Sequence, residues 1–176
     1  MALKSDIRQQ LIDERVRALA IMHLTRRDDL VIQEASEDNG LDLLVHFPPE
    51  NKEGLRLLGV KHQGRWESGS RNHTKQVVRP ILNTMRRKGL FPFPVCLFLF
   101  TMEKDEAWYT WVAEPVIKPD GRPHLQVHDQ AYCLPLDKTA LDGIIEAVDQ
   151  WYGAFFGTVI IEGHEQASRK KRHANV

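Results

Sequence analysis

The chain has 176 residues, the size of one domain with a substantial hydrophobic core. Its 24 Lys and Arg residues balance its 24 Asp and Glu residues, so net charge gives no argument for nucleic acid, a membrane surface or an acidic substrate as partner, although it leaves room for a local basic patch. The two cysteines lack zinc-site spacing, and a reducing, cytoplasmic compartment is expected. With no signal-peptide pattern and no apolar run long enough to cross a bilayer, we expect no membrane partner.

The first part of the chain predicts one helix followed by three strands. Ser5 can cap a helix that runs to about Leu24, with apolar side chains at helical spacing. Strands are expected over residues 30–35, 41–47 and 55–63, because apolar runs there are separated by turn residues and by two prolines that lack a donor for strand pairing.

The middle of the chain predicts a loop, a helix and a hairpin. Residues 64–72 are rich in Gly, Ser and Arg and predict a mobile loop. A helix is expected between Thr74 and Lys88, with Pro80 either beginning or kinking its regular part. The apolar runs 93–101 and 107–112 flank a polar turn and predict a β-hairpin.

The last part of the chain predicts an irregular segment and a final helix. Residues 116–130 show no clear period, although Pro119-Asp120-Gly121 is typical of a turn. Asp137 or Thr139 can cap a helix with apolar residues at helical spacing. We therefore expect one domain over residues 1–165, followed by a basic, disordered tail over residues 166–176.

Two opposite charges lie on neighbouring predicted strands. Asp42 is near the start of the second strand, and Lys61 is in the middle of the third. A charge inside an apolar strand is costly to bury without a partner, so the two side chains are expected to meet. The pair allows two interpretations: the centre of a metal-dependent phosphodiesterase, or an ordinary ion pair between strands.

The order of elements, together with these charges, resembles the PD-(D/E)XK nuclease superfamily and, more narrowly, the domain of unknown function family numbered 4365. The resemblance covers roughly residues 13–112. It rests on Gly40-Leu41-Asp42-Leu43, on Val60-Lys61 and on the later apolar strands at 93–100 and 107–112. It implies an α/β (α+β) fold with a restriction-endonuclease-like mixed central sheet flanked by helices.

The resemblance also implies roles for individual residues. Asp42 matches the metal-binding Asp, Lys61 the Lys that positions or activates the attacking water, and Glu14 the Glu of the first helix. Gly59 departs from the pattern, because the family has Gln or an acidic residue there. Strand alternation offers two substitutes: Gln63 shares a face with Lys61 and can partly replace the missing ligand, and His46 shares a face with Asp42 and can lie near the site. With Gln63, the ligand set for Mg²⁺ or Mn²⁺ would be Asp42, Glu14 and Gln63.

Basic residues follow the candidate site. Arg65, Arg71, Lys75 and Arg79 are candidates for contacts with nucleic-acid phosphates, or they belong to a solvated loop. The histidines at 46, 62 and 73 lack metal-ligand spacing and are interpreted as surface or loop residues.

The residues and the resemblance together predict a metal-dependent nuclease acting on DNA or RNA. The resemblance places such a protein in a prokaryotic defence or mobile-element system. The alternative is a catalytically degenerate nuclease fold that serves as a nucleic-acid-binding or protein-interaction subunit, an interpretation supported by Gly59. A protein partner or a homo-oligomer is compatible with both.

Overall fold

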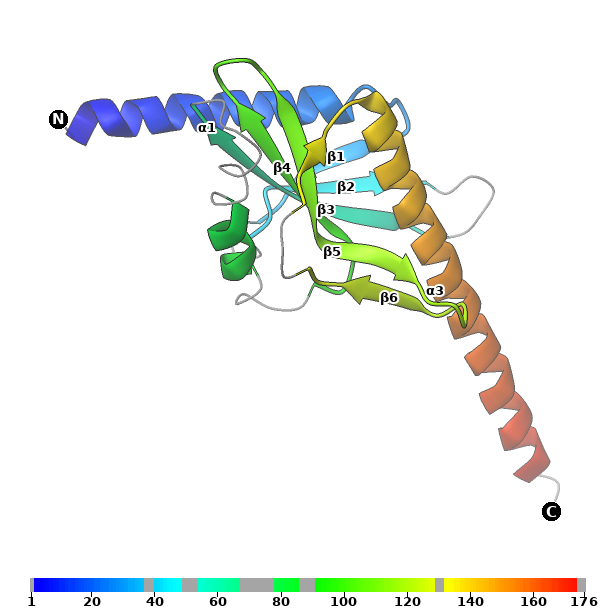
Figure 1. Cartoon of the computed structure of the whole chain (residues 1–176). Coiled ribbons are helices and arrows are strands. Elements are labelled where there is room, and N and C mark those ends of the chain that lie inside the picture. Colours follow the sequence, from blue (N-terminus) through cyan, green and yellow to red (C-terminus); the bar gives the residue numbers. More distant parts are fainter. Residues whose placement is uncertain are drawn as a thin grey trace.

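The structure of the protein is a computed structural model that describes residues 2–36, 40–48, 54–66, 78–85, 91–128 and 132–173, with side chains described for residues 7–157 within these ranges. The chain forms one mixed β-sheet with helices on both faces (Figure 1). This arrangement confirms the predicted α/β fold class with a mixed central sheet flanked by helices.

Seven strands in the described part of the chain make up the sheet. Its order follows the chain from β1 to β6, and β7 pairs with β5. Every pair is antiparallel except β3 and β4, which are parallel. A parallel pair requires a crossover, and the chain between β3 and β4 includes a helix at residues 78–85. The strands are β1 (Val31–Glu34), β2 (Leu43–Phe47), β3 (Arg56–Arg65), β4 (Val95–Thr101), β5 (Ala107–Ile117), β6 (Pro123–Gln126) and β7 (Leu134–Pro135).

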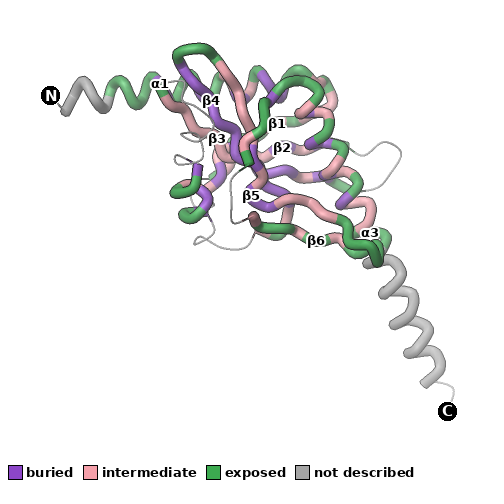
Figure 2. Tube along the Cα trace, in the orientation of Figure 1, coloured by how far each residue is buried: buried purple, intermediate pink, exposed green. Residues whose placement is uncertain are grey.

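Two buried clusters show which helices cover which face of the sheet. The helices α1 (Ala2–Leu24) and α3 (Lys138–His173) pack against alternate residues of β2, β3 and β4 on one face. The helix at 78–85 packs against the intervening residues of β4 on the other face. Because it lies between the two clusters, β4 is buried along its whole length (Figure 2).

The helix α1 approaches the sheet closely at Gly64 of β3. A Cβ atom at Gly64 would lie 2.2 Å from Val16 Cγ2 and 2.7 Å from Ile12 Cγ2. Ile12, Val16 and Ala20 recur at helical spacing and are buried, as the sequence predicted. The missing side chain at Gly64 therefore sets the distance between α1 and the strand that carries Lys61.

Most predicted elements are confirmed. The first helix, the three strands after it, the hairpin of β4 and β5 and the final helix are all present, and the predicted helix between 74 and 88 is described over 78–85. Ala140 N donates to Asp137 Oδ1 at 2.8 Å, so Asp137 caps α3. The predicted loop at 64–72 begins later than expected, because β3 continues to Arg65, and residues 67–72 lie outside the described residues.

The prediction of an irregular segment at 116–130 was wrong in its first part. β5 continues to Ile117, and Glu114–Ile117 pairs with β6 around the predicted turn. Gly121 has a φ of 81°, and Arg122 N donates to Asp120 Oδ1 at 3.1 Å, which stabilises the turn. The four residues of β6 lack the apolar alternation of a core strand, and the strand forms by backbone pairing with β5.

The backbone of α3 is helical to His173, where the sequence predicted a disordered tail from residue 166. Alanine, lysine and arginine favour helix, so the basic segment can continue α3. Residues 174–176 lie outside the described residues. Among the helices that the structure describes, none has an apolar stretch long enough to span a bilayer.

Candidate functional site

A carboxylate and an ammonium group meet where β2 begins beside β3. Leu43 pairs with Val60 in antiparallel register, so Asp42 lies across from Lys61. Lys61 Nζ donates to Asp42 Oδ1 at 2.7 Å, and the side chains of Lys61 and Asp42 are 28% and 22% exposed. The structure thus brings together the first and last residues of the predicted motif.

Asp42 also ends the pairing of β2 with β3. Its backbone N donates to the Val60 carbonyl at 2.9 Å, and its Oδ2 accepts the His62 N–H at 2.6 Å. From here to its end, β3 has no partner residue in β2. The side-chain amide of Gln63 donates to the Gly64 carbonyl at 3.3 Å. The side chains of Asp42 and Gln63 therefore form hydrogen bonds with backbone groups along this edge of β3. Such bonds protect a sheet edge from pairing with another chain.

His62 belongs to the site, although the sequence placed it on the surface or in a loop. It lies in β3, and its Nδ1 is 3.5 Å from Asp42 Oδ2. Burial lowers the pKa of His62 below 6.5; the Asp42 charge opposes this shift and the Lys61 charge adds to it. The ring is therefore neutral at neutral pH. The signal that predicts this position is the alternation of Leu58 and Val60, which continues to residue 62.

An open hollow of about 420 Å³ lies beside this pair, lined by Asp42, Lys61 and His62. An ion pair between Arg17 of α1 and Glu34 of β1 lines it as well. A second hollow, of about 290 Å³, lies between β3 and the helix at 78–85 and is lined by Lys61 and Gln63. Lys61 lines both hollows, so its ammonium group is accessible to a ligand in either of them.

Among the hollows in the described part of the chain, Glu14 and Asp42 line different ones. Its side chain is exposed on α1 and lines a neighbouring hollow of about 450 Å³. His62 and Arg17 line both that hollow and the one beside Asp42. Glu14 is thus adjacent to the pair, with Arg17 and His62 between the two carboxylates.

Tight packing explains the departure from the family pattern at Gly59. A Cβ atom there would lie 2.9 Å from Leu41 Cδ1, 3.0 Å from Phe93 Cε2 and 3.1 Å from Val95 Cγ2. These three side chains belong to the apolar cluster under the helix at 78–85. A carboxylate or amide at position 59 would have to displace them, so the position is filled by the hydrophobic core.

The available donors decide how a divalent metal ion can be held. Among the described residues, no three His, Cys, Asp or Glu side chains form a group that could hold a metal ion. Mg²⁺ can instead be bound by one or two carboxylates, several waters and substrate phosphates. Of the three predicted ligands, Asp42 fits that mode, whereas Glu14 lines the next hollow and Gln63 donates to the backbone. A metal here would be held by Asp42 together with the substrate.

The four predicted nucleic-acid-binding residues differ in placement. Arg65 ends β3 on the face that carries Lys61, and its Nη1 is buried with no hydrogen-bond acceptor in the described part of the chain. Arg79 is exposed on the helix at 78–85, and Arg71 and Lys75 lie outside the described residues. A buried nitrogen is out of reach of a phosphate, so any phosphate contact of Arg65 would have to come from another part of its partly exposed guanidinium group.

Comparison with known proteins adds no relative to this description. No protein-family model matches the chain, and neither the curated proteins nor the solved structures include a match. The resemblance to PD-(D/E)XK nucleases therefore depends on the motif residues.

Proposed function

We propose that this chain is a metal-dependent nuclease that hydrolyses phosphodiester bonds in DNA or RNA. One observation carries the proposal: Asp42 and Lys61 come from two strands and meet at 2.7 Å beside an open hollow, in the strand order that the PD-(D/E)XK resemblance implies. The hollow gives both charges access to a ligand, which an ion pair with a purely structural role does not need.

The chemistry assigns a separate task to each residue. Hydrolysis requires positive charge beside the scissile phosphate and a water molecule that can lose a proton. Mg²⁺ or Mn²⁺, held by Asp42 and the substrate, supplies charge neutralisation at the phosphate when it is bound. Lys61 lies in position to contact a phosphate oxygen or the attacking water. Neutral His62, whose pKa is lowered by burial, can accept a proton from that water.

A second candidate function is binding of nucleic acid without cleavage, on a nuclease fold that has lost its activity. The packing at Gly59 favours it, because the family's second ligand is replaced by Leu41, Phe93 and Val95. Both oxygens of Asp42 also have donors within the chain, one from Lys61 and one from the His62 backbone. In this case Lys61 and Arg65 bind phosphate, and Asp42 has a structural role.

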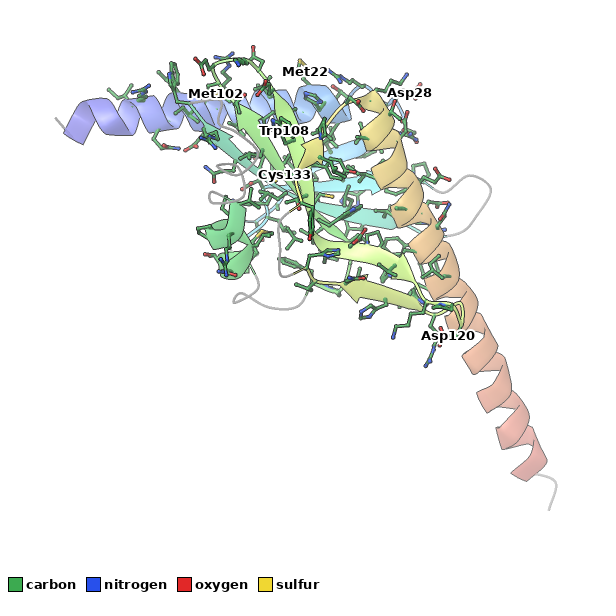
Figure 3. All side chains as sticks on the ribbon, viewed as in Figure 1. Met22, Asp28, Met102, Trp108, Asp120 and Cys133 are labelled. Atoms are coloured by element: carbon green, nitrogen blue, oxygen red, sulfur yellow. The ribbon has the colours of Figure 1, made fainter. Side chains whose placement is uncertain are left out.

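A cleavage assay tests the first candidate. Purified wild-type protein is incubated with single-stranded and duplex DNA and RNA in Mg²⁺ or Mn²⁺, beside Asp42→Ala and Lys61→Ala. We expect metal-dependent cleavage by the wild type and a loss of at least about 100-fold in each variant, the size seen when a charge-stabilising group is removed from an active site. Asp120→Ala is the matched control, because it removes a carboxylate paired with Arg122 at the β5–β6 turn, in another part of the fold (Figure 3).

The three possible results separate the two candidates. Cleavage that the Asp42 and Lys61 variants lose and Asp120→Ala keeps supports the nuclease. Salt-dependent binding without cleavage, lost in Lys61→Ala and kept in Asp42→Ala, supports the binding protein and contradicts the nuclease. Wild-type protein that neither cleaves nor binds any of the four substrates, alone or with protein partners supplied, rejects both candidates.

A further inference from the structure

An apolar hollow lies beside the first half of α1. Its volume is about 520 Å³, and Ile7, Leu11 and Ile12 of α1 line it together with Trp66 and Met102. Met102 N donates to the Arg65 carbonyl at 2.8 Å, which holds the end of β4 beside the end of β3 under α1 (Figure 3). The hollow is therefore built from α1 and from the residues that directly follow β3 and β4.

Ile12 and Met102 form the floor of this hollow and belong to the hydrophobic core, whereas three of its large side chains do not. Ile7, Leu11 and Trp66 are 54%, 66% and 51% exposed. The surface of α1 elsewhere is largely charged or amide-bearing, so three large apolar side chains around one hollow form a distinct patch. Such a patch on a soluble domain is typical of a binding surface.

The chemistry of the patch favours nucleobases over other apolar ligands. The guanidinium carbon of Arg8 lies 4.5 Å from the centre of the Trp66 ring, and Arg8 has no carboxylate partner among the residues whose side chains are described. An exposed indole with a cation over its ring is a combination by which single-stranded nucleic acids are bound, because a base stacks on the aromatic surface and the cation attracts the backbone. An apolar protein partner would instead desolvate the Arg8 charge and supply no anion to it.

The patch is close to the proposed active site at Asp42 and Lys61. Trp66 is the fifth residue after Lys61 and directly follows the end of β3, which corresponds to about 16 Å along the chain at the usual rise of a strand. A few nucleotides can cover that length. Trp66 lies against α1, on the face of β3 that carries His62, and His62 lines the hollow beside Lys61. We propose that the Trp66 hollow is a base-stacking subsite that binds unpaired nucleotides of a single-stranded DNA or RNA whose backbone lies at Lys61. This inference rests on the proposed nucleic-acid function and adds a preference for single strands.

Binding of matched oligonucleotides tests the subsite. Oligothymidylate and oligouridylate of about 12 nucleotides are compared with an abasic DNA of equal length and charge, by fluorescence anisotropy without divalent metal and at fixed salt. We expect the wild type to bind the base-bearing strands more tightly than the abasic strand. Trp66→Ala should lose about 5- to 140-fold in affinity for the base-bearing strands and nothing for the abasic strand. Trp66→Phe should retain much of the preference, and Ile117→Ala, an exposed apolar residue of β5, should retain all of it.

Each other result overturns the subsite in a distinguishable way. If Trp66→Ala binds the base-bearing strands like the wild type while Lys61→Ala does not, the subsite is absent and the nucleic-acid function stands. If the wild type binds neither strand, the function and the subsite fail together. If the wild type is a dimer in sedimentation and Trp66→Ala is a monomer, the patch is an interface between copies of the chain, and the proposal is wrong.

Discussion

Gly59 and Gly64 of β3 are both required for packing, on opposite faces of the sheet. Gly59 leaves room for Leu41, Phe93 and Val95 under the helix at 78–85, and Gly64 leaves room for α1. Side chains alternate along a strand, so positions five residues apart face opposite sides. The strand that carries Lys61 is therefore approached closely from both directions.

Gly64→Ala is expected to destabilise the protein by about 1–3 kcal/mol, because the new methyl group would overlap Val16 and Ile12 and move α1 away from β3. The unfolding free energy from urea denaturation measures the effect. Gly143→Ala is the matched control: Gly143 is exposed in α3, and no atom lies within 4 Å of its added Cβ. That variant should be more stable by up to about 1 kcal/mol, because alanine favours helix. Equal effects of the two variants would contradict the packing argument.

Two histidines should make the stability depend on pH. Burial lowers the pKa of His62, and burial together with Arg26 lowers the pKa of His23, both below 6.5. As the pH falls through 6.5, the unfolded chain takes up protons that the folded chain does not, so the unfolding free energy decreases until the lower folded pKa values are passed. Urea denaturation between about pH 7.5 and 5.5 should show this decrease.

Substitution of these histidines should flatten the pH profile. His23→Gln and His62→Gln each remove one contribution, so each variant should lose less stability than the wild type over the same pH interval. His124→Gln, at an exposed position in β6, serves as control. A profile that keeps its full slope in both variants would show that other groups cause the pH dependence.

At the scale of elements, a buried arginine joins the start of β3 to α3. Arg56 is 1% exposed, its Nε donates to Asp149 Oδ1 at 2.9 Å, and the rings of Tyr152 and Phe156 lie 5.6 and 5.1 Å from its guanidinium carbon. Tyr152 Oη also donates to the Leu57 carbonyl at 3.3 Å. A buried guanidinium group is stable only if a carboxylate balances its charge. The packing of α3 against the start of β3 therefore depends on Asp149.

Asp149→Ala is expected to destabilise the protein by about 3 kcal/mol, which is the lower end of the range for breaking a buried ion pair. The lower end applies because Asp149 is partly exposed, so water can replace part of the stabilisation that its carboxylate gives to Arg56. Asp142→Ala lies two turns earlier in α3 and removes a partner of Arg27, whose side chain is 26% exposed. That variant should lose at most about 1 kcal/mol, because a solvated pair contributes little. Thermal denaturation of both variants provides the comparison, and a larger loss in Asp142→Ala would reverse the assignment.

At the scale of the whole molecule, the pattern of the sequence predicts the elements that bury a regular apolar face. Ile12, Val16 and Ala20 define α1, and the runs at 93–101 and 107–112 define β4 and β5. The same patterns place Asp42 and Lys61 on neighbouring strands, and antiparallel pairing then brings them together. The meeting of Asp42 and Lys61 therefore follows from the periodicity of two strands and from the short connection between β2 and β3.

The remaining features depend on contacts between distant parts of the chain. The helical period of α1 predicts that Glu14 lies beside the apolar face of the helix. It does not predict whether Glu14 or another residue of α1 faces Asp42, because that depends on the direction in which α1 crosses the sheet. The packing at Gly59 involves Leu41 and Phe93, which lie 18 and 34 residues away in the sequence. β6 was missed because its four residues show no apolar alternation, and their pairing with β5 is a contact that local sequence does not reveal.

The alternation of β3 limits how this strand can change in evolution. Leu58, Val60, His62 and Gly64 face α1 and α3, and the residues between them, including Lys61, face the other side. Gain or loss of one residue near the start of β3 would turn Lys61 away from Asp42 and bring a side chain against α1 in place of Gly64. Length variation in this part of the protein is therefore confined to the connections on either side of β3, and the strand itself can change only by substitution.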